Sequence, residues 1–456
     1  MDIAGKEVVI VGFGKTGRAL ARFLVDRNAR VTVSEIREER DLGSEIRRWK
    51  EKGVAFETGA HRPLTLLSAD LIIPSPGAAA LPALAAAKKA GVPVLSEIEL
   101  ASHFLKGRIV GITGTNGKST TASLAHKILK EAGFKSFLAG NIGTPLISFA
   151  ERSRADHVYV TEISSFQLEH VRHFKADVSV FLNLSLNHLD WHASFDAYVA
   201  AKKKLVLAQG AEDIAILNAD DRLVGGLAKV IRPKTYLFSR RRPVRRGCFM
   251  RDGRILLRED TREDLLMKAG EIPLLGRHNE ENVMAAALVG WVLGATPRSM
   301  RASIRSFSGL EHRLEKVLTW RGVEFINDSK ATTVDATIKA LQSFERRIIL
   351  ILGGRDKGAD FKLLRPEIRR RVKRVVLLGE AAKKIAAALQ GLVPMVEAVS
   401  LREAVGAAAS SASRGDIVLL APACTSFDMF KNFEARGRAF KREADRLAAE
   451  ARKERN

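Results

Sequence analysis

Short apolar runs rich in β-branched residues alternate with helical runs along almost the whole chain. KEVVIVGFG is followed by TGRALARFLVDRN and then by RVTVSE, and the same rhythm returns in RIVGITGTNGKSTTASLAHKILKEAG and in RRIILILGG. Strands that alternate with helices in this way form mainly parallel sheets covered by helices. The alternation therefore predicts an α/β protein.

The alternation falls into three blocks, and a chain of 456 residues is too long for one hydrophobic core. We predict an N-terminal domain over residues 1–98, a central domain over 99–309 and a C-terminal domain over 310–456. Between about 235 and 275 the rhythm weakens, and CFMRDGRILL predicts a hairpin with an Asp-Gly turn. The final stretch, KREADRLAAEARKERN, predicts a charged amphipathic helix.

Composition narrows the class of protein. Hydrophobic residues make up 46% of the chain, with 13 Pro and 35 Gly, which is typical of globular domains. No apolar run approaches the roughly 18 residues needed to cross a bilayer, and the charged start MDIAGKE does not resemble a signal peptide. Two cysteines, Cys248 and Cys424, make no disulfide framework and suggest a reducing compartment. We expect a soluble, cytoplasmic protein.

The formal net charge of +23 raises the question of a nucleic-acid partner. The basic residues are widely spread, and the densest run, SRRRPVRR at 239–246, lacks the interleaved aromatic residues of a base-stacking surface. A polyanionic small molecule would suit such a field equally well. We therefore expect no nucleic acid as the principal partner.

A first glycine cluster, GFGKTG at 12–17, follows the strand VVIV and opens a helix, and Glu35 ends the next strand. Glycines in this setting let a diphosphate approach a helix N-terminus, and the carboxylate can accept ribose hydroxyls. The alternative is a tight turn without a ligand. We favour a diphosphate-bearing nucleotide, either NAD or a UDP-sugar, with backbone donors at Ser75 and Gly77 beside it.

A second loop, GITGTNGKSTT at 111–121, lies between a buried strand and a helix. It departs from the usual G-x-x-x-x-G-K-[ST] template because Ile112 stands where that template has glycine. Gly114 and Gly117 nevertheless let backbone N–H groups face phosphates, Lys118 supplies a positive charge, and Ser119 can hold Mg²⁺. The loop predicts binding of a nucleoside triphosphate.

Polar residues follow two further strands of the central block. Glu162 comes after HVYV and His188 after VSVFLNLSL, so both are expected at the edge of the sheet that carries the phosphate loop, where they could meet a second Mg²⁺. Each alone is more simply a surface residue. The triple lysine 202–204, taken from its pattern alone, predicts a solvated helix face.

Nine ordered motifs together resemble the Mur ligases of peptidoglycan synthesis, and the match covers essentially the whole chain. They are GTNGKS, EISSFQLE, NHLDWH, AYVAAKKK, GRHNEENVMAA, EHRLE, NDSKATT, GGRDKGADF and PACTSFDMFKNFEARG. The family writes its ATP loop T-G-T-N-G-K-[ST], so Ile112 is no defect. The resemblance implies three domains: a Rossmann-like N-terminal domain for UDP, a central P-loop-type ATPase with a mainly parallel sheet, and a Rossmann-like C-terminal domain that closes over the site.

The resemblance also implies roles for individual residues. The catalytic and metal-binding positions are Lys118, Ser119, Glu162, His188 and Lys202, the last as a carbamylated lysine, which replaces the solvated-face interpretation. The ATP-binding positions are Gly114, Thr115, Asn116, Gly117, Lys118, Ser119, Thr120, Asn279, Asn282, Arg313 and Asp328. The UDP and muramoyl-alanine positions are Phe13, Lys15, Thr16, Glu35, Ile36, Arg37, Ser75, Gly77, Asn141, Ser164 and Gln167. The amino-acid positions are Lys330, Thr332, Lys357, Ser426, Phe427 and Phe433.

The implied reaction is ATP-dependent amide formation with two Mg²⁺ ions. The NDSKAT motif is most similar to that of the members that add D-glutamate to UDP-N-acetylmuramoyl-L-alanine through an acyl phosphate. Departures from the family pattern are Thr333, where many relatives have asparagine, and Asn187, where some have an acid. The alternatives are an NAD-dependent oxidoreductase, a nucleic-acid-dependent ATPase and a polyglutamate-adding ligase. We expect a monomer.

Overall fold

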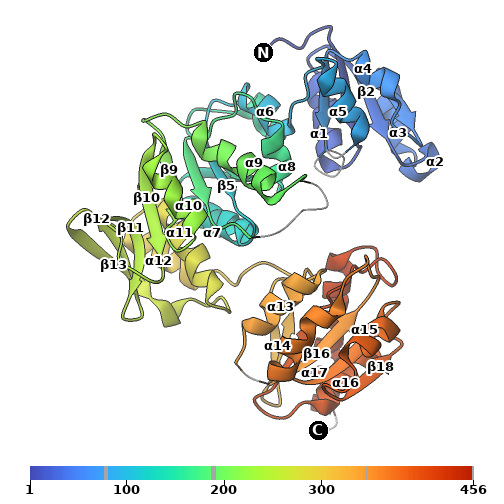
Figure 1. Ribbon diagram of the computed structural model, residues 1–456, viewed down its shortest axis with the longest axis vertical. Coiled ribbons are helices and arrows are strands. Elements are labelled where there is room, and N and C mark those ends of the chain that lie inside the picture. The colour runs from blue at the N-terminus through green and yellow to red at the C-terminus, as the bar shows by residue number, and fades with distance from the viewer. Residues whose placement is uncertain (76–80, 186–191, 346, 454–456) are drawn as a thin grey trace. The chain divides into compact units, whose positions relative to one another are not determined.

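The computed structural model describes all residues except 76–80, 186–191, 346 and 454–456. The chain forms two compact units: Met1–Ile272 with Glu280–Ser306, and Pro273–Asn279 with Phe307–Asn456. Three sheets lie within them, two in the first unit and one in the second (Figure 1). This mixed α/β architecture with mainly parallel sheets confirms the predicted fold class, whereas the predicted boundaries at 98/99 and 309/310 stay predictions.

The N-terminal sheet has four parallel strands in the order β3-β2-β1-β4. Its strands are β1 (Glu7–Val11), β2 (Arg30–Glu35), β3 (Ala55–Thr58) and β4 (Leu71–Pro74). Its helices are α1 (Lys15–Val25), α2 (Glu39–Leu42), α3 (Glu45–Lys50), α4 (Pro63–Leu67) and α5 (Pro82–Lys89), and α6 (Glu97–Ser102) follows. The strand order reverses beside β1, so the loop after β1 lies at a topological switch point, where α/β proteins bind ligands.

The central sheet has nine strands in the order β13-β12-β11-β10-β9-β8-β5-β7-β6. They are β5 (Arg108–Thr113), β6 (Lys135–Gly140), β7 (His157–Glu162), β8 (Val178–Phe181), β9 (Ile214–Asn218), β10 (Lys234–Ser239), β11 (Arg246–Arg251), β12 (Arg254–Glu259) and β13 (Arg262–Lys268). The helices are α7 (Lys118–Glu131), η1 (Leu146–Arg152), α8 (Ser165–Glu169), α9 (Phe195–Leu207), α10 (Arg222–Gly226), η2 (Leu227–Lys229), η3 (Ala269–Glu271), α11 (His278–Leu293) and α12 (Pro297–Arg305). β5 lies between β7 and β8, which is again a switch point.

β12 pairs antiparallel with β11 on one side and with β13 on the other, and the other strand pairs of this sheet are parallel. The turn between β11 and β12 is Asp252-Gly253, with φ of +50° and +68°, which confirms the predicted hairpin.

The sheet of the second unit has six strands in the order β14-β15-β19-β16-β17-β18, of which only β14 is antiparallel. They are β14 (Glu315–Trp320), β15 (Val323–Asn327), β16 (Ile348–Gly353), β17 (Val372–Leu378), β18 (Met395–Ala398) and β19 (Ile417–Leu420). The helices are α13 (Val334–Gln342), η4 (Phe361–Leu364), α14 (Arg365–Arg371), α15 (Ala382–Leu389), α16 (Leu401–Ser411) and α17 (Phe433–Lys453). Alternate residues of β16 enter two separate cores, one on each face, as in a doubly wound sheet.

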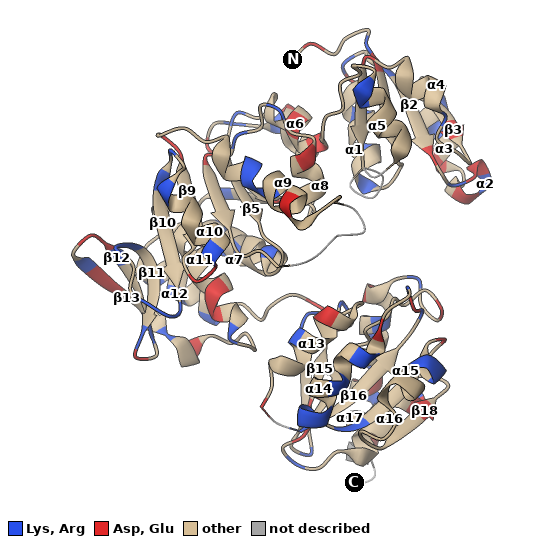
Figure 2. Ribbon diagram, in the orientation of Figure 1, with Lys and Arg blue, Asp and Glu red and all other residues tan. Residues whose placement is uncertain are grey.

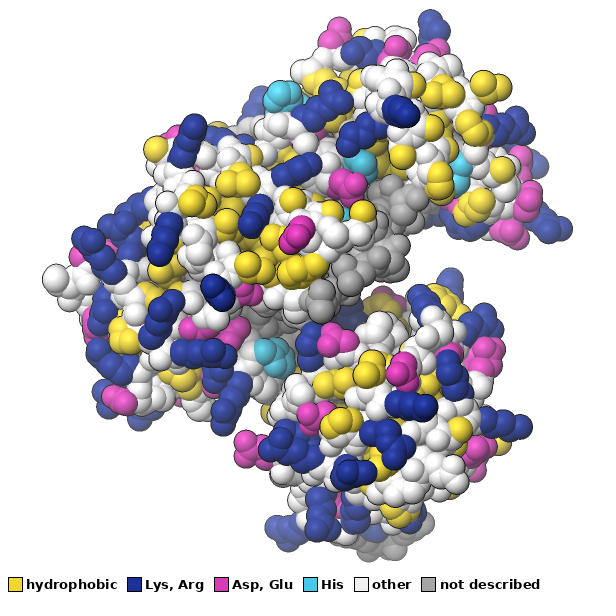
Figure 3. Space-filling model, in the orientation of Figure 1, with side chains coloured by type: hydrophobic (Ala, Val, Ile, Leu, Met, Phe, Trp, Pro, Cys, Tyr) yellow, Lys and Arg dark blue, Asp and Glu magenta, His cyan; other side chains and the backbone are white. Residues whose placement is uncertain are grey.

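Lys and Arg side chains are scattered among acidic ones on the face seen in Figure 3, and they occur on elements of both units (Figure 2). Three of the five arginines in the basic segment 239–246 form ion pairs within the chain, one of which joins Arg246 to Glu259 at 3.0 Å. Arg240 pairs with Glu280 at 2.5 Å, and Arg245 with Asp260 at 3.1 Å. Cys248 and Cys424 are both free and buried. No helix in the described ranges is long and apolar enough to cross a membrane.

Candidate active site

The predicted phosphate loop connects β5 to α7 at the switch point of the central sheet. Gly117, the residue before α7, has φ of +84°, and a Cβ at this position would lie 2.2 Å from Oδ1 of Asn282. Only glycine fits here, because both the backbone conformation and the neighbouring amide exclude a side chain. The loop therefore packs directly against Asn282 of α11, and Thr121 donates a hydrogen bond to the same Oδ1 at 3.3 Å.

Lys118 and Ser119 occupy the first turn of α7, a helix of 14 residues. The Lys118 Nζ donates to the carbonyl oxygens of Gly114 at 2.9 Å and Thr115 at 3.0 Å, so its charge lies within the loop. Ser119 is buried. A helix N-terminus with a lysine folded into a glycine loop is suited to hold phosphate groups.

Lys202 is buried, with 2% of its surface exposed, and its Nζ joins Lys118 on the same carbonyl. It donates to Gly114 O at 2.9 Å and to Thr113 Oγ1 at 3.2 Å. Burial, and secondly the nearby Lys118 ammonium, hold the pKa of Lys202 well below its usual range, although Glu162 opposes this. A lysine in this environment gives up its proton more readily than an exposed one.

The interpretation of residues 202–204 as a solvated helix face is wrong for Lys202. Each residue of a helix is rotated by about 100° from the previous one, so three consecutive lysines point in different directions. On α9, Lys202 faces the phosphate loop, while Lys204 is exposed and donates to the carbonyl of Glu169 at 2.8 Å.

Glu162 ends β7, directly opposite Ile112 of β5. Its Oε1 accepts a hydrogen bond from Asn141 Nδ2 at 2.7 Å, whereas Oε2 is buried and has no hydrogen-bond partner among the described residues. A buried carboxylate oxygen without a partner is costly, and a cation would satisfy it. Glu162 therefore fits the predicted Mg²⁺ position. The other predicted ligand, His188, lies outside the described residues, as do Asn187 and Gly77.

Two residues that the motif analysis did not single out position the loop. Asn183 follows β8, accepts from Asn116 N at 2.9 Å and donates back to Asn116 O at 3.2 Å. Tyr198 shares a 2.9 Å hydrogen bond with Thr115 Oγ1 and its ring lies 5.0 Å from Lys202 Nζ. Asn183 could have been predicted from the sequence, because it is a polar residue at the carboxyl end of a predicted strand.

The first glycine cluster forms the turn between β1 and α1. A Cβ on Gly17 would lie 2.2 Å from Gly12 O, so helix and turn approach each other closely. Glu35 accepts from Phe13 N at 2.7 Å and from Arg37 Nη2 at 2.9 Å, in addition to Arg37 N and Nε at 3.1 Å each. Burial alone would raise the pKa of Glu35, but these bonds outweigh it and lower the pKa to about 2. A carboxylate with four donors has no spare position, so a ribose hydroxyl would have to displace one of them.

The other predicted UDP and muramoyl-alanine residues divide into two groups. Lys15 donates to the carbonyl of Gly143, and Ser75 Oγ donates to Gly12 O at 3.2 Å, so both lie at the glycine turn, as does Thr16 in the first turn of α1. Ser164 and Gln167 form a capping box at the start of α8 and are buried. This hydrogen bonding gives the second pair a structural role of its own.

In the second unit, the predicted residues gather at the carboxyl ends of β15, β16 and β19. Asp328 follows β15 and accepts from Leu314 N at 3.3 Å. Burial raises its pKa to about 7, against the opposing effects of the Leu314 amide, Arg313 and Lys330. Lys330 lies with its Nζ 5.3 Å from the ring of Phe433. Thr332 follows β15, Lys357 follows β16, and Ser426 and Phe427 lie in the turn after β19. Asn279 is the exception, because it lies in the first turn of α11 and donates to Leu275 O at 2.6 Å.

A buried arginine that sequence reasoning missed joins these loops. Arg436 of α17 donates to Ser329 O at 2.9 Å, Ser329 Oγ at 3.0 Å and Cys424 O at 3.1 Å. Burial lowers its pKa to about 10. The arginine thus holds the loops after β15 and β19 against each other.

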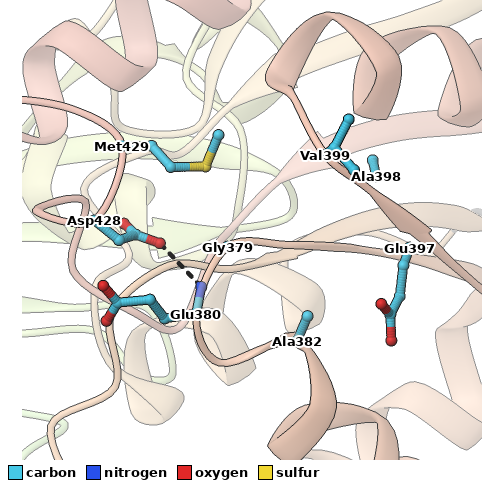
Figure 4. A pocket seen from close by; sticks show the side chains of 8 residues that line it. All are labelled: Gly379, Glu380, Ala382, Glu397, Ala398, Val399, Asp428 and Met429. Carbon is cyan, nitrogen blue, oxygen red and sulfur yellow. Dashed lines mark hydrogen bonds between the residues drawn. The ribbon is translucent and has the colours of Figure 1, made fainter.

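A pocket of about 360 Å³ lies beside these loops, between the ends of β17 and β18 (Figure 4). Asp428 and Met429 face Val399 across it, and Asp428 accepts from Glu380 N at 3.2 Å. None of the predicted site residues lines this pocket.

Comparison with known proteins places the chain in a family. Three domain families match in order: "Mur ligase MurD-like, N-terminal domain" at residues 6–96, "Mur ligase middle domain" at 112–290 and "Mur ligase, glutamate ligase domain" at 312–424. The UDP-N-acetylmuramoylalanine--D-glutamate ligase of Acidobacterium capsulatum is 47% identical over 97% of this chain and 96% of that protein. The protein of the same name from Koribacter versatilis is 45% identical, over 99% of this chain and 100% of that protein.

Solved structures agree on the fold. The UDP-N-acetylmuramate-alanine ligase MurC of Thermotoga maritima superposes with a TM-score of 0.60 at 17% identity, covering 97% of this chain and 100% of that one. A pseudomurein peptide ligase type C from Methanothermus fervidus gives 0.59 at 20%, with 97% and 100% covered. The ordered domain matches and the full-length relatives show that the chain belongs to the Mur ligase family.

Proposed function

We propose that the protein is an ATP-dependent, ADP-forming ligase that joins D-glutamate to UDP-N-acetylmuramoyl-L-alanine in peptidoglycan precursor synthesis. Relatives of that name, 45–47% identical over nearly the full length, support the substrates. The observation in the chain itself that carries the proposal is the convergence of Lys118 and Lys202 on the Gly114 carbonyl. Glu162 contributes the buried oxygen without a partner among the described residues. We further propose that the protein works in the cytoplasm as a monomer.

Amide formation from a carboxylate requires activation. The alanine carboxylate of the nucleotide substrate attacks the γ-phosphorus of ATP, the bond to the β–γ bridging oxygen breaks, and ADP leaves. The amine of D-glutamate then attacks the acyl carbon, loses a proton, and expels inorganic phosphate through a tetrahedral intermediate. Negative charge builds on the transferring phosphoryl group and then on the oxyanion, so preorganised cations accelerate both steps.

Lys118 is the residue that meets the transferring phosphoryl group. Its Nζ is held by two carbonyl oxygens of the loop, and phosphate oxygens at the N-terminus of α7 would replace them. Ser119, Glu162, His188 and Lys202 would hold magnesium, which supplies electrophilic stabilisation of the phosphoryl oxygens.

Lys202 takes part as a carbamate. Its neutral amine adds to CO₂, forming an N–C bond and releasing one proton, and this converts a buried cation into an anion suited to a metal. Burial favours the neutral amine that this step requires. The lowered pKa of Lys202, and the Glu162 oxygen that has no hydrogen-bond partner among the described residues, together support the fit of these residues to a cation.

The two other substrates are assigned by domain. The glycine turn after β1, with Glu35, Ile36 and Arg37, takes the uridine diphosphate. Lys330 and Lys357 provide the positive charges that the two carboxylates of D-glutamate require. Since the acyl phosphate must meet the amine, we propose that the C-terminal domain closes during the reaction.

Phosphate release tests the proposal directly. ATP, Mg²⁺ and UDP-N-acetylmuramoyl-L-alanine should give phosphate with D-glutamate and far less with L-glutamate, meso-diaminopimelate or L-lysine. Lys118→Ala should lower turnover by about 10²–10³, the usual cost of removing one contact to a developing charge. Lys130→Ala, which changes an exposed lysine at the end of the same helix, is the matched control. Turnover of Lys118→Ala near the wild-type rate, or phosphate release that depends on DNA or RNA, would contradict the assignment.

A further inference from the structure

His61 makes a specific contact at the end of the N-terminal sheet that no role assigned so far explains. Its Nδ1 lies 2.8 Å from Oγ of Ser34. Ser34 is fully buried, with 0% of its surface exposed, while the histidine ring is half-buried. A buried hydroxyl needs a hydrogen-bond partner, and among the described residues His61 supplies it.

Ser34 and His61 are connected to the nucleotide-binding turn through the backbone. Gly12 N donates to Ser34 O at 2.8 Å, and the next residue, Glu35, accepts from Phe13 N at 2.7 Å. On the other side, Gly59 N donates to Arg37 O at 3.1 Å, which ties the segment after β3 to the segment after β2. His61 therefore lies at the carboxyl edge of the sheet, beside Glu35–Arg37.

The position of β3 suggests which part of a nucleotide His61 would meet. Neighbouring strands are about 4.8 Å apart, so β3, two strands from β1, lies roughly 10 Å from the glycine turn. That separation is comparable to the length of a nucleotide from its phosphates to its base. Ile36, between the two positions, leaves 60% of its surface exposed and offers an apolar contact for a flat ring.

Only one ring nitrogen of His61 is engaged among the described residues. Burial lowers the pKa of His61, against the effect of the Glu35 carboxylate, and thereby favours the neutral ring. A neutral imidazole whose Nδ1 is bonded to a hydroxyl can donate or accept one hydrogen bond at Nε2. A neutral ring suits the carbonyl or hydroxyl groups of a nucleoside better than a phosphate.

We propose that His61 is a further substrate-binding residue, held by Ser34 through Nδ1 and hydrogen-bonded through Nε2 to the nucleoside end of the uridine nucleotide. This inference rests on the proposed function, because it takes the uridine diphosphate group as the ligand of the N-terminal domain. It adds a specificity contact outside the glycine turn.

Three substitutions of His61 distinguish the roles of its two ring nitrogens. The amide of His61→Asn can replace Nδ1 but does not reach the position of Nε2, whereas His61→Gln can reach that position and does not replace Nδ1; His61→Ala removes both. Binding of UDP, UMP and inorganic diphosphate to the full chain is measured by calorimetry, with circular dichroism as the check on folding. His61→Ala and His61→Asn should weaken UDP and UMP about two- to twelvefold, the range for one neutral hydrogen bond, and leave diphosphate unchanged.

His61→Gln should bind UDP and UMP with most of the wild-type affinity. In steady-state assays, the KM for the uridine substrate should rise by the same factor in His61→Ala and His61→Asn, with kcat and the KM for ATP unchanged. If His61→Asn kept the affinity for UDP and UMP while His61→Gln lost it, the proposal would be overturned, because His61 would then only support Ser34. Unchanged binding in all three variants would overturn it as well. Absence of UDP binding by the wild-type chain would instead refute the proposed function itself.

Discussion

Replacement of Lys202 by methionine distinguishes the effect of the amine on turnover from its effect on the stability of the fold. Methionine has nearly the length of the lysine stem, so the packing of α9 against the phosphate loop is kept, while the amine is lost. Lys202→Ala would be a poorer test, because losing about three buried methylene groups costs roughly 2–3 kcal/mol in stability before any effect on the reaction.

The structure sets the expected size of each effect. The Gly114 carbonyl keeps its bond from Lys118 at 2.9 Å, so Lys202→Met leaves only the Thr113 hydroxyl without its 3.2 Å contact. The ammonium no longer has to be desolvated, which offsets this loss. We therefore expect the free energy of unfolding to change by less than about 1 kcal/mol. Turnover should fall by about 10²–10³, equivalent to about 3–4 kcal/mol in the activation barrier.

Three measurements test this prediction. Phosphate release gives turnover, thermal unfolding gives stability, and ¹³C NMR of protein in labelled bicarbonate detects the carbamate carbon. Lys204→Met, two residues along the same helix and exposed, is the control and should behave like the wild type. Short carboxylic acids should restore part of the activity of Lys202→Ala, where they have room to bind. Turnover of Lys202→Met within about threefold of the wild type would refute the metal-binding role, and a carbamate signal that persists in Lys202→Met would assign it elsewhere.

Two further predictions concern a glycine and a buried acid. Gly117→Ala should abolish ATP binding measured by calorimetry, and it should destabilise the chain more than the control Gly133→Ala. Gly133 has a similar φ of +92°, but no atom lies within 4 Å of a Cβ added there. Equal effects of the two substitutions would show that the contact of residue 117 with Asn282 is unimportant. Asp328 keeps its proton up to about pH 7 in the folded chain but ionises near 3.8 when unfolded, so its contribution to stability is lost as the pH rises from about 4 to 7. In calorimetry, Asp328→Asn should therefore raise the unfolding temperature of the C-terminal domain at pH 8 and leave it unchanged at pH 4. A lower unfolding temperature at pH 8 would contradict the conclusion that the ionised, buried Asp328 carboxylate destabilises the folded chain.

The parts of the site that lie next to a strand end were accessible from the sequence. Glu162 and the loop around Lys118 each follow an apolar run, and residues at the carboxyl ends of parallel strands meet at one edge of the sheet. The hairpin turn at Asp252 was likewise a local pattern. These features depend on residues close together in the chain, so their spacing alone predicts them.

Other contacts escaped prediction because they join residues that are far apart in the chain. Glu35 was expected to accept a ribose hydroxyl, but the backbone amide of Phe13, 22 residues away, donates to one of its oxygens. Arg436 lies 107 residues from Ser329, whose loop it holds. Neither contact leaves a repeat or a spacing that sequence reasoning can recognise.

The sequence by itself determined the alternation of strands and helices, the two glycine turns and the membership of a family, because periodicity and motif spacing are local properties of the chain. Only the tertiary structure decided which of three consecutive lysines is buried, which oxygen of Glu162 is left without a partner among the described residues, and where His61 meets Ser34. These depend on how side chains from distant segments share space and hydrogen bonds, and packing of that kind is settled only when the whole domain is folded.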